Sequence, residues 1–141
     1  MKAILLDTGP VIAILDRRDS HHEWMLPRFA QLQGRLVTTG AVVTEATFFL
    51  QDIKDGILRL FEFLEAPHVE IRDAFTQPRL HSAATLMAAY ADTPMDFADA
   101  TLVVLAEELE TNQIITLDER GFRAFRYRRN KKFQLLLQDQ P

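Results

Sequence analysis

The sequence predicts an α/β protein, a three-layer α/β/α sandwich around a five-stranded parallel sheet. The first observation is the run Ala-Ile-Leu-Leu at residues 3–6, because a short unbroken apolar run is typical of a strand buried on both faces. The second is that similar short runs alternate along the chain with longer segments whose apolar residues keep helical spacing. Such alternation indicates strands joined by helices that cover both faces of the sheet.

The strands are expected at short apolar runs bounded by turn residues or acids. They lie at residues 3–6, 35–38, 69–71 and 113–117, with a marginal fifth strand at either 132–136 or 125–127. After the first strand come Asp7 and then Thr8-Gly9-Pro10, in which Thr8 offers a capping hydroxyl and Pro10 suits a first helical turn. The pattern predicts a strand, a sharp turn and a helix, with Asp7 at the carboxyl end of the strand, where ligands bind in open α/β sheets.

The helices are expected where apolar residues recur every three or four positions. Their ranges are 11–15, 20–32, about 40–50, 56–64, 76–90 and 97–110. Ser20 can cap the second of these helices, and Gly34 follows its end. Pro67 ends the fourth, and Asp92-Thr93-Pro94 separates the last two.

The composition is that of a globular protein, with 48% apolar and 26% charged residues in a chain of 141. We expect one domain spanning residues 1–141. Because there is no cysteine, any metal must be held by oxygen or imidazole. The apolar runs are too short to cross a bilayer and no signal peptide is evident. We therefore expect a cytoplasmic protein without a membrane partner.

Four carboxylates stand where this layout would bring them to one edge of the sheet. Asp7 and Asp118 each follow an apolar strand, Glu45 borders the apolar stripe of its helix, and Asp99 lies in the first turn of the helix after Pro94. Asp7 alone can be explained as a helix cap, and Asp99 by the helix dipole. However, no lysine or arginine lies within four residues of Asp7, Glu45 or Asp99, so local ion pairs do not explain them. An oxygen-rich acidic site suits Mg²⁺ or Mn²⁺, which can activate water and offset charge on a phosphodiester.

Asp96 has two interpretations, because it lies three residues before Asp99 and shares a helix face with it. It can contact a metal ion, or it can cap the helix as the first residue after Pro94-Met95. We favour the cap.

Four segments of the chain together resemble one family. They are Ile4-Leu5-Leu6-Asp7-Thr8, Val43-Thr44-Glu45-Ala46, Met95-Asp96-Phe97-Ala98-Asp99-Ala100 and Ile115-Thr116-Leu117-Asp118-Glu119-Arg120-Gly121-Phe122. In this order and at this spacing they resemble the PIN domain, in its toxin branch of VapC-like ribonucleases from toxin–antitoxin pairs.

The resemblance implies a sheet of order 3-2-1-4-5 and Mg²⁺-dependent (or Mn²⁺-dependent) cleavage of RNA. Asp7, Glu45, Asp99 and Asp118 match the family's acidic quartet, with Asp7 and Asp99 as the principal metal ligands. Thr8 matches the family's usual serine or threonine and is expected to contact the substrate. The expected partners are an RNA substrate and a cognate antitoxin, and we expect a homodimer.

The net charge of −4 conceals a basic segment at the end of the chain. Residues 1–119 carry 9 basic and 19 acidic side chains, whereas residues 120–141 carry 7 basic and 1 acidic. Arg126, Arg128 and Arg129 are the candidates in this segment for holding RNA phosphates. The same segment can instead hold an acidic antitoxin tail, or only keep the protein in solution.

Other functions fit the sequence less well. A phospho-acceptor receiver domain carries an adjacent acidic pair after its first strand and a lysine at a late strand end, whereas this chain has the single Asp7 and then Asp118. A phosphatase of the haloacid-dehalogenase type needs a second aspartate two residues after the first, where Gly9 stands. A catalytically silent binding module with the PIN fold stays open as the main alternative.

Overall fold

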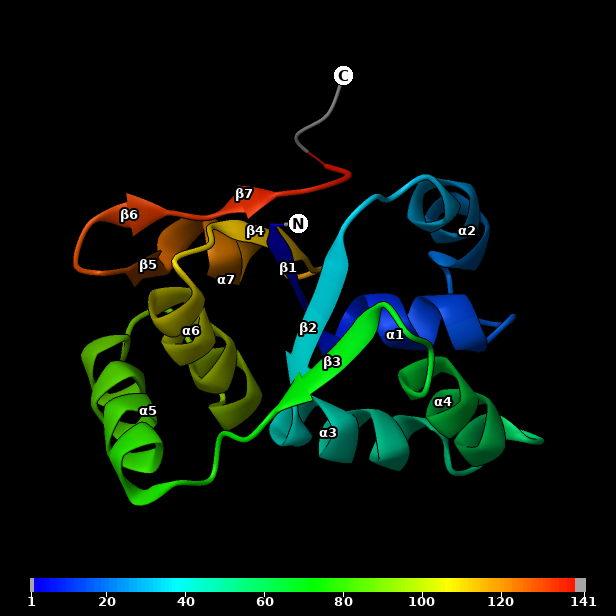
Figure 1. Ribbon diagram of the computed structural model, residues 1–141, viewed down its shortest axis with the longest axis horizontal. Helices are drawn as coiled ribbons and strands as arrows, with labels where there is room; N and C mark the ends of the chain where they lie inside the picture. Colours follow the sequence, from blue (N-terminus) through cyan, green and yellow to red (C-terminus); the bar gives the residue numbers. More distant parts are fainter. Residues whose placement is uncertain (1, 139–141) are drawn as a thin grey trace.

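The sheet forms the centre of the molecule, and all five of its strands run parallel. In this computed structural model, which describes residues 2–138, its order is β3-β2-β1-β4-β7 (Figure 1). The strands are β1 (Ala3–Leu6), β2 (Arg35–Thr39), β3 (Val69–Arg72), β4 (Gln113–Ile115) and β7 (Gln134–Leu135). The predicted order is therefore confirmed, with β7 as the fifth strand of the sheet.

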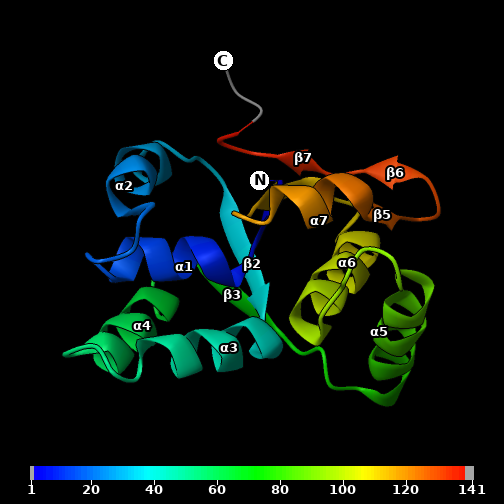
Figure 2. The same ribbon diagram turned by 180° about the vertical axis from the view of Figure 1, so that it is seen from behind.

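Helices cover both faces of the sheet, as Figures 1 and 2 show from opposite sides. One layer contains α1 (Thr8–Leu15), α2 (His22–Ala30), α3 (Gly40–Leu50) and α4 (Gly56–Leu64). The other contains α5 (Gln77–Ala89), α6 (Phe97–Leu109) and the short α7 (Glu119–Ala124). Ile4 and Leu6 pack toward the first layer, while Ala3 and Leu5 pack toward the second. This alternation explains the unbroken apolar run of β1, and the three-layer prediction is confirmed.

The register of the sheet brings the ends of β1 and β4 together. Leu6 of β1 pairs with Ile115 of β4, and the backbone N–H of Asp7 donates to the carbonyl of Ile115 at 3.0 Å. Because parallel strands end at the same edge, the residues after β1 and after β4 become neighbours. Residues more than a hundred positions apart in sequence therefore share one site.

Helix α6 is the most deeply packed helix of the described chain. Residues 98–106 are all buried, because α6 lies between the sheet and α5 (Figure 1). A helix that is apolar or small on every side suits this position. Asp99 is the one charged residue in this buried stretch, and it lies in the first turn.

Several local expectations are wrong. The residue before α2 is His21, which makes no capping hydrogen bond with its side chain, and the Ser20 hydroxyl instead lies 3.3 Å from His21 Nδ1. Helix α7 was not predicted, since six residues with Gly121 among them give no helical apolar pattern. Residues 125–127 do not join the main sheet: β5 (Arg126–Tyr127) pairs antiparallel with β6 (Lys131–Lys132) as a separate hairpin.

No helix within residues 2–138 combines the length and the apolar character needed to span a bilayer.

Candidate active site

Asp7 is held rigidly at the carboxyl end of β1. Its Oδ1 accepts a hydrogen bond from the backbone N–H of Thr8 at 2.8 Å, and its Oδ2 accepts one from the hydroxyl of Thr116 at 2.7 Å. The side chain is only 7% exposed, and Asp7 is the N-cap of α1. Asp7 therefore supplies the cap that was expected from the Thr8 hydroxyl, and that expectation is wrong.

Asp96 and Asp99 form a reciprocal capping box at the start of α6. Asp96 Oδ1 accepts from the backbone N–H of Asp99 at 2.8 Å, and Asp99 Oδ2 accepts from the backbone N–H of Asp96 at 3.2 Å. The prediction that Asp96 caps the helix is confirmed. Because the two bonds fix the first turn of α6, they also hold the Asp99 carboxylate in place.

Thr116 joins the two strand ends, a role that the sequence did not reveal. Its hydroxyl donates to Asp7 and accepts from the backbone N–H of Asp118 at 3.0 Å. One hydroxyl can do both, since it has one hydrogen and two lone pairs. The one signal in the sequence was that Thr116 lies two positions before Asp118. A threonine at that position is equally typical of an ordinary strand residue.

Asp118 caps α7 and depends on the glycine three residues later. Its Oδ1 accepts from the backbone N–H of Gly121 at 3.0 Å. A Cβ atom at position 121 would overlap the Asp118 carboxylate. The glycine therefore lets the carboxylate lie against the first turn of the helix.

The carboxylates lie close enough to repel one another. Burial, together with the negative charges of Asp7, Asp96 and Asp118, raises the pKa of Asp99 from 3.8 to about 8, although the hydrogen bond from the Asp96 backbone N–H opposes this rise. Burial also raises the pKa of Asp7 to about 6; the hydrogen bonds from Thr116 and Thr8 oppose this rise, and the charges of Glu45 and Asp96 add to it. The structure thus brings all four predicted acids, with Asp96, into one electrostatic cluster.

The donor chemistry of this cluster fits a hard divalent cation, because the side chains that converge offer only oxygen. Thr8 Oγ1, beside Asp7, is buried and has no hydrogen-bond partner within residues 2–138, so it can bond to a water or substrate oxygen. Across those same residues no three acidic or histidine side chains are close enough together to enclose an ion. Mg²⁺ does not need such an enclosure, since it commonly binds one or two carboxylates and keeps several waters. Asp7 and Asp99 are the residues that would hold it.

The arginines predicted to bind substrate do not lie in this cluster. Arg126 donates from one guanidinium nitrogen to the carbonyls of Arg123, Ala124 and Phe125, which end α7.

Arg128 is tied to the far end of α6. It donates to the carbonyl of Glu107 at 3.0 Å and pairs with Glu110 at 2.8 Å. At 1.5 Å per residue these acids lie about 15 Å along the helix axis from Asp99. Arg129 is exposed at the turn of the hairpin, with a φ of 74°. The structure therefore separates the basic hairpin from the acidic cluster.

Comparison with known proteins identifies the family. A family model described as PIN domain matches residues 4–126, most of the chain. The chain belongs to the PIN domain family. All four acids of the predicted quartet lie inside the matched range of this PIN domain, whereas Arg128 and Arg129 lie beyond it.

Individual relatives agree with this assignment. The chain is 27% identical over 125 residues to Ribonuclease VapC26 of Mycobacterium tuberculosis (strain ATCC 25618 / H37Rv), a match that covers 87% of this chain and 92% of the relative. Its fold is similar to the crystal structure of Mycobacterium tuberculosis VapC20, described as a Sarcin-Ricin loop cleaving toxin. That comparison gives a TM-score of 0.75 at 15% identity and covers 82% of this chain and 89% of the other.

The raised pKa values of Asp7 and Asp99 give a prediction about stability. Between the ordinary carboxyl pKa of 3.8 and the values of about 6 and about 8, the folded protein binds more protons than the unfolded chain. The free energy of unfolding of the metal-free protein should therefore fall as the pH rises from about 4 to about 8. Replacing Asp99 by Asn removes the ionisable group and keeps an oxygen for the capping box.

We expect Asp99→Asn to melt at least about 3 °C higher than wild type at pH 7.5 in EDTA, which corresponds to about 1 kcal/mol. The difference should shrink at pH 5, and the variant should lose most of the stabilisation by Mn²⁺. Thermal melts at both pH values measure this, with the exposed Glu62→Gln as the control for loss of one acid. A variant that melts lower than wild type in EDTA and keeps the full response to Mn²⁺ would contradict the shared site.

Gly121→Ala tests the contact between α7 and Asp118. The new methyl group should push the Asp118 carboxylate aside, because that carboxylate is the mobile end of its side chain. We expect the stabilisation by Mn²⁺ to fall at least about twofold with little change in the melting temperature in EDTA, since alanine favours helix. Gly9→Ala is the matched control, because its Cβ would meet only the Leu117 side chain, at 3.3 Å or more. Equal stabilisation of the two variants by Mn²⁺ would show that the position of Asp118 does not affect binding of the ion.

Proposed function

We propose that this protein is a Mg²⁺- or Mn²⁺-dependent endoribonuclease, the toxin of a toxin–antitoxin pair, with residues 1–141 acting as one nuclease domain in the cytoplasm. The observation that carries the proposal is the pair of buried, mutually repelling carboxylates Asp7 and Asp99 at the carboxyl edge of the sheet. Such a pair is stabilised by a cation. The matched relative is named a ribonuclease and the matched structure is described as a toxin that cleaves the Sarcin-Ricin loop, and both support the same chemistry.

Each residue of the site has a separate task in this proposal. Asp7 and Asp99 hold the ion, which when bound supplies an activated water and offsets negative charge on the phosphodiester. The charge of Glu45, half-buried on α3, raises the pKa of Asp7, and that of Asp118 raises the pKa of Asp99. In the proposal these two acids orient the attacking water or a second ion. The free hydroxyl of Thr8 contacts the substrate.

Two further residues act on these groups and not on the substrate. Thr116 is a positioning residue, since its hydroxyl fixes both the Asp7 side chain and the Asp118 backbone. Asp96 positions Asp99 through the capping box. Catalysis by pre-positioned charges requires such rigid support.

The exposed apolar side chains support the proposed protein partners. Large apolar residues are exposed on neighbouring elements: Phe48 and Phe49 on α3, Leu58 and Phe61 on α4, and Ile71 on the edge strand β3. Exposed apolar surface of this kind marks protein interaction sites. We assign it to the homodimer contact and to the antitoxin. Light scattering of the purified protein measures its mass in solution, and a monomer at high concentration would remove the dimer from the proposal.

Substitution of the acids tests the nuclease. Asp7→Asn and Asp99→Asn should each lower RNA cleavage at least about a hundredfold, because an amide oxygen is a weaker ligand for Mg²⁺ than a carboxylate. Glu45→Gln and Asp118→Asn should also be severe. Asp96→Asn should stay within about threefold of wild type, since asparagine caps helices as well as aspartate does.

Cleavage of total RNA is measured with Mg²⁺, with Mn²⁺ and with EDTA. A wild-type protein that binds RNA and cleaves none under any of these conditions would be the catalytically silent binding module instead.

The basic hairpin gives a separate prediction. Arg126 and Arg128 hold the hairpin in place, which leaves Arg129, Lys131 and Lys132 exposed and available to RNA phosphates. Reversing these three to glutamate should weaken RNA binding and reduce the slope of log affinity against log salt by about 2. The control reverses Arg17, Arg18 and Lys54, which are equally exposed. Unchanged RNA binding with loss of antitoxin affinity would assign the hairpin to the antitoxin.

A further inference from the structure

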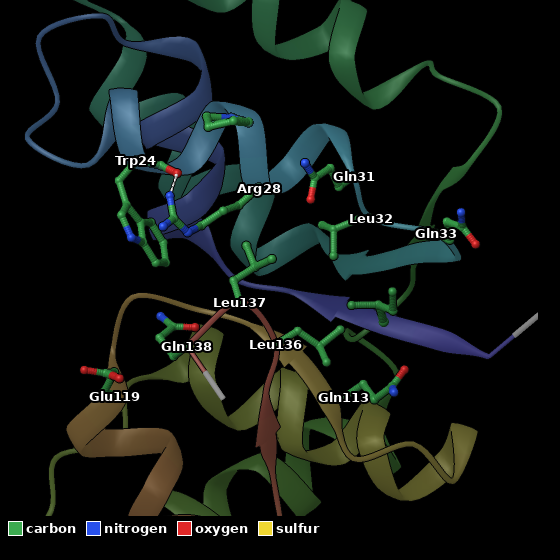
Figure 3. Close-up of a pocket in the computed structure, with 12 residues that line it drawn as sticks. Trp24, Arg28, Gln31, Leu32, Gln33, Gln113, Glu119, Leu136, Leu137 and Gln138 are labelled. Atoms are coloured by element: carbon green, nitrogen blue, oxygen red, sulfur yellow. Dashed lines mark hydrogen bonds between the residues drawn. The ribbon is translucent and has the colours of Figure 1, made fainter. Parts of the chain in front are cut away.

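A wide groove lies between α2 and the residues that follow β7. Its volume is about 970 Å³, within the range of about 300 to 1,000 Å³ typical of small-ligand sites. Figure 3 shows Leu136 and Leu137 along one side of the groove and α2 with Leu32 along the other. One end is at Glu119, the residue after Asp118.

The polar lining of the groove consists mainly of amides. Gln31, Gln33, Gln113 and Gln138 contribute side chains from three different parts of the chain (Figure 3). An amide carries both donors and acceptors of hydrogen bonds, as the edges of nucleobases do. The groove therefore matches the hydrogen-bonding chemistry of a nucleobase.

The charged residues of the lining point to an uncharged ligand group. Arg28 and Glu119 are the two charged residues among those that line the groove, and their charges are opposite. The two charges sum to zero, so the lining carries no net positive charge to attract a phosphate. A neutral base needs no such charge.

Trp24 and Arg28 provide a flat surface on the α2 side. The Arg28 guanidinium lies 4.4 Å from the centre of the Trp24 ring, and one of its nitrogens donates to the Trp24 carbonyl at 2.8 Å. This bond fixes the arginine over the ring (Figure 3). Aromatic rings and arginine planes are the groups on which proteins stack unpaired RNA bases.

Gln138 connects the groove to the catalytic acids. Its Nε2 donates to the backbone carbonyl of Thr116 at 2.6 Å, and the hydroxyl of the same Thr116 donates to Asp7. The Oε1 atom of Gln138 is buried and has no hydrogen-bond partner in the described part of the chain. A buried acceptor of this kind is costly unless a ligand supplies a donor.

We propose that this groove binds an unpaired nucleobase of the RNA next to the cleaved phosphodiester, with Gln138 Oε1 accepting a hydrogen bond from the exocyclic amino group of the base. The proposal rests on the nuclease function proposed above and adds a preference to it. Adenine, cytosine and guanine carry such an amino group and uracil does not. Gln138 is therefore a specificity-determining residue that selects against uridine at the position beside the cut.

The distribution of apolar surface favours a base over a protein segment as the occupant. The exposed large apolar side chains lie mainly on α3, α4, β3 and α5, and the one on α2, Leu26, does not line the groove. Beside its apolar residues the groove presents four amides, which the apolar anchors of a peptide would leave without hydrogen-bond partners.

The single tryptophan of the chain gives a direct probe, because Trp24 lines the groove. The wild-type protein in EDTA, where cleavage should not occur, is titrated with the tetranucleotides r(A)4, r(C)4 and r(U)4 while Trp24 fluorescence is followed. We expect r(A)4 and r(C)4 to quench the fluorescence and to bind about tenfold more tightly than r(U)4, as one hydrogen bond to a buried acceptor allows.

Variants identify the groups responsible. Gln138→Leu should remove the difference between r(C)4 and r(U)4, and Gln51→Leu, an amide on the end of α3, should preserve it. Arg28→Gln should weaken all three oligonucleotides at least about threefold, and because Arg28 is exposed the variant should fold normally. Arg28→Gln therefore tests base binding in the groove even if Gln138→Leu does not fold.

Two results would overturn the proposal. In the first, no oligonucleotide changes the Trp24 fluorescence, whereas a second copy of the chain or the antitoxin does change it. The groove would then be a protein interface. The other is equal binding of r(C)4 and r(U)4 by the wild type. If either result occurs while total RNA is cleaved normally in Mn²⁺, the base-binding groove is excluded and the nuclease function stands. If the oligonucleotides quench selectively but no RNA is cleaved, only the nuclease function is excluded.

Discussion

The repulsion between buried carboxylates at the carboxyl edge of the sheet is the constraint on which the site depends. Asp7 and Asp99 are both nearly inaccessible, and burial raises the pKa of each of them. The charge of Asp7 raises the pKa of Asp99 as well, and other nearby acids add to both shifts. Without a cation such a cluster destabilises the fold, because buried negative charge has lost the solvation of water. The surrounding chain must therefore hold it together mechanically, through the Thr116 hydroxyl and the capping box of α6. A rigid acidic cluster of this kind is stabilised most when a divalent ion binds.

The fold supplies that rigidity from its most stable parts. Asp7 extends from the central strand β1, and Asp99 from α6, whose residues 98–106 are entirely buried. The acids thus lie at the ends of elements whose own positions are fixed by packing on both sides of the sheet. The more exposed acid, Asp118, is held by a local device instead, since the first turn of α7 and the absence of a side chain at Gly121 determine where its carboxylate lies.

The two candidate RNA contacts outside the acidic cluster differ in chemistry and in position. The β5–β6 hairpin, which presents Arg129, Lys131 and Lys132, is fixed to the far end of α6 from Asp99 and offers charge alone. The groove beside α2 offers amides, a stacked ring and one buried acceptor, and it adjoins the acidic cluster through Gln138 and Thr116. Charge far from the site suits non-selective affinity for phosphates, whereas directional groups next to the site suit selection of a base.

The sequence by itself determined the fold class, the strand order implied by its resemblance to the PIN domain and the four acids of the cluster, because unbroken apolar runs and the acids that follow them are local patterns. It also identified Asp96 as a cap. Only the tertiary structure decided the role of Thr116, since its partner Asp7 lies 109 positions away, and the use of Arg126 and Arg128 as structural ties. The groove could not be predicted from the sequence either, because its glutamines come from separate parts of the chain. Such contacts depend on how parallel strands align, and no local pattern of residues records that alignment.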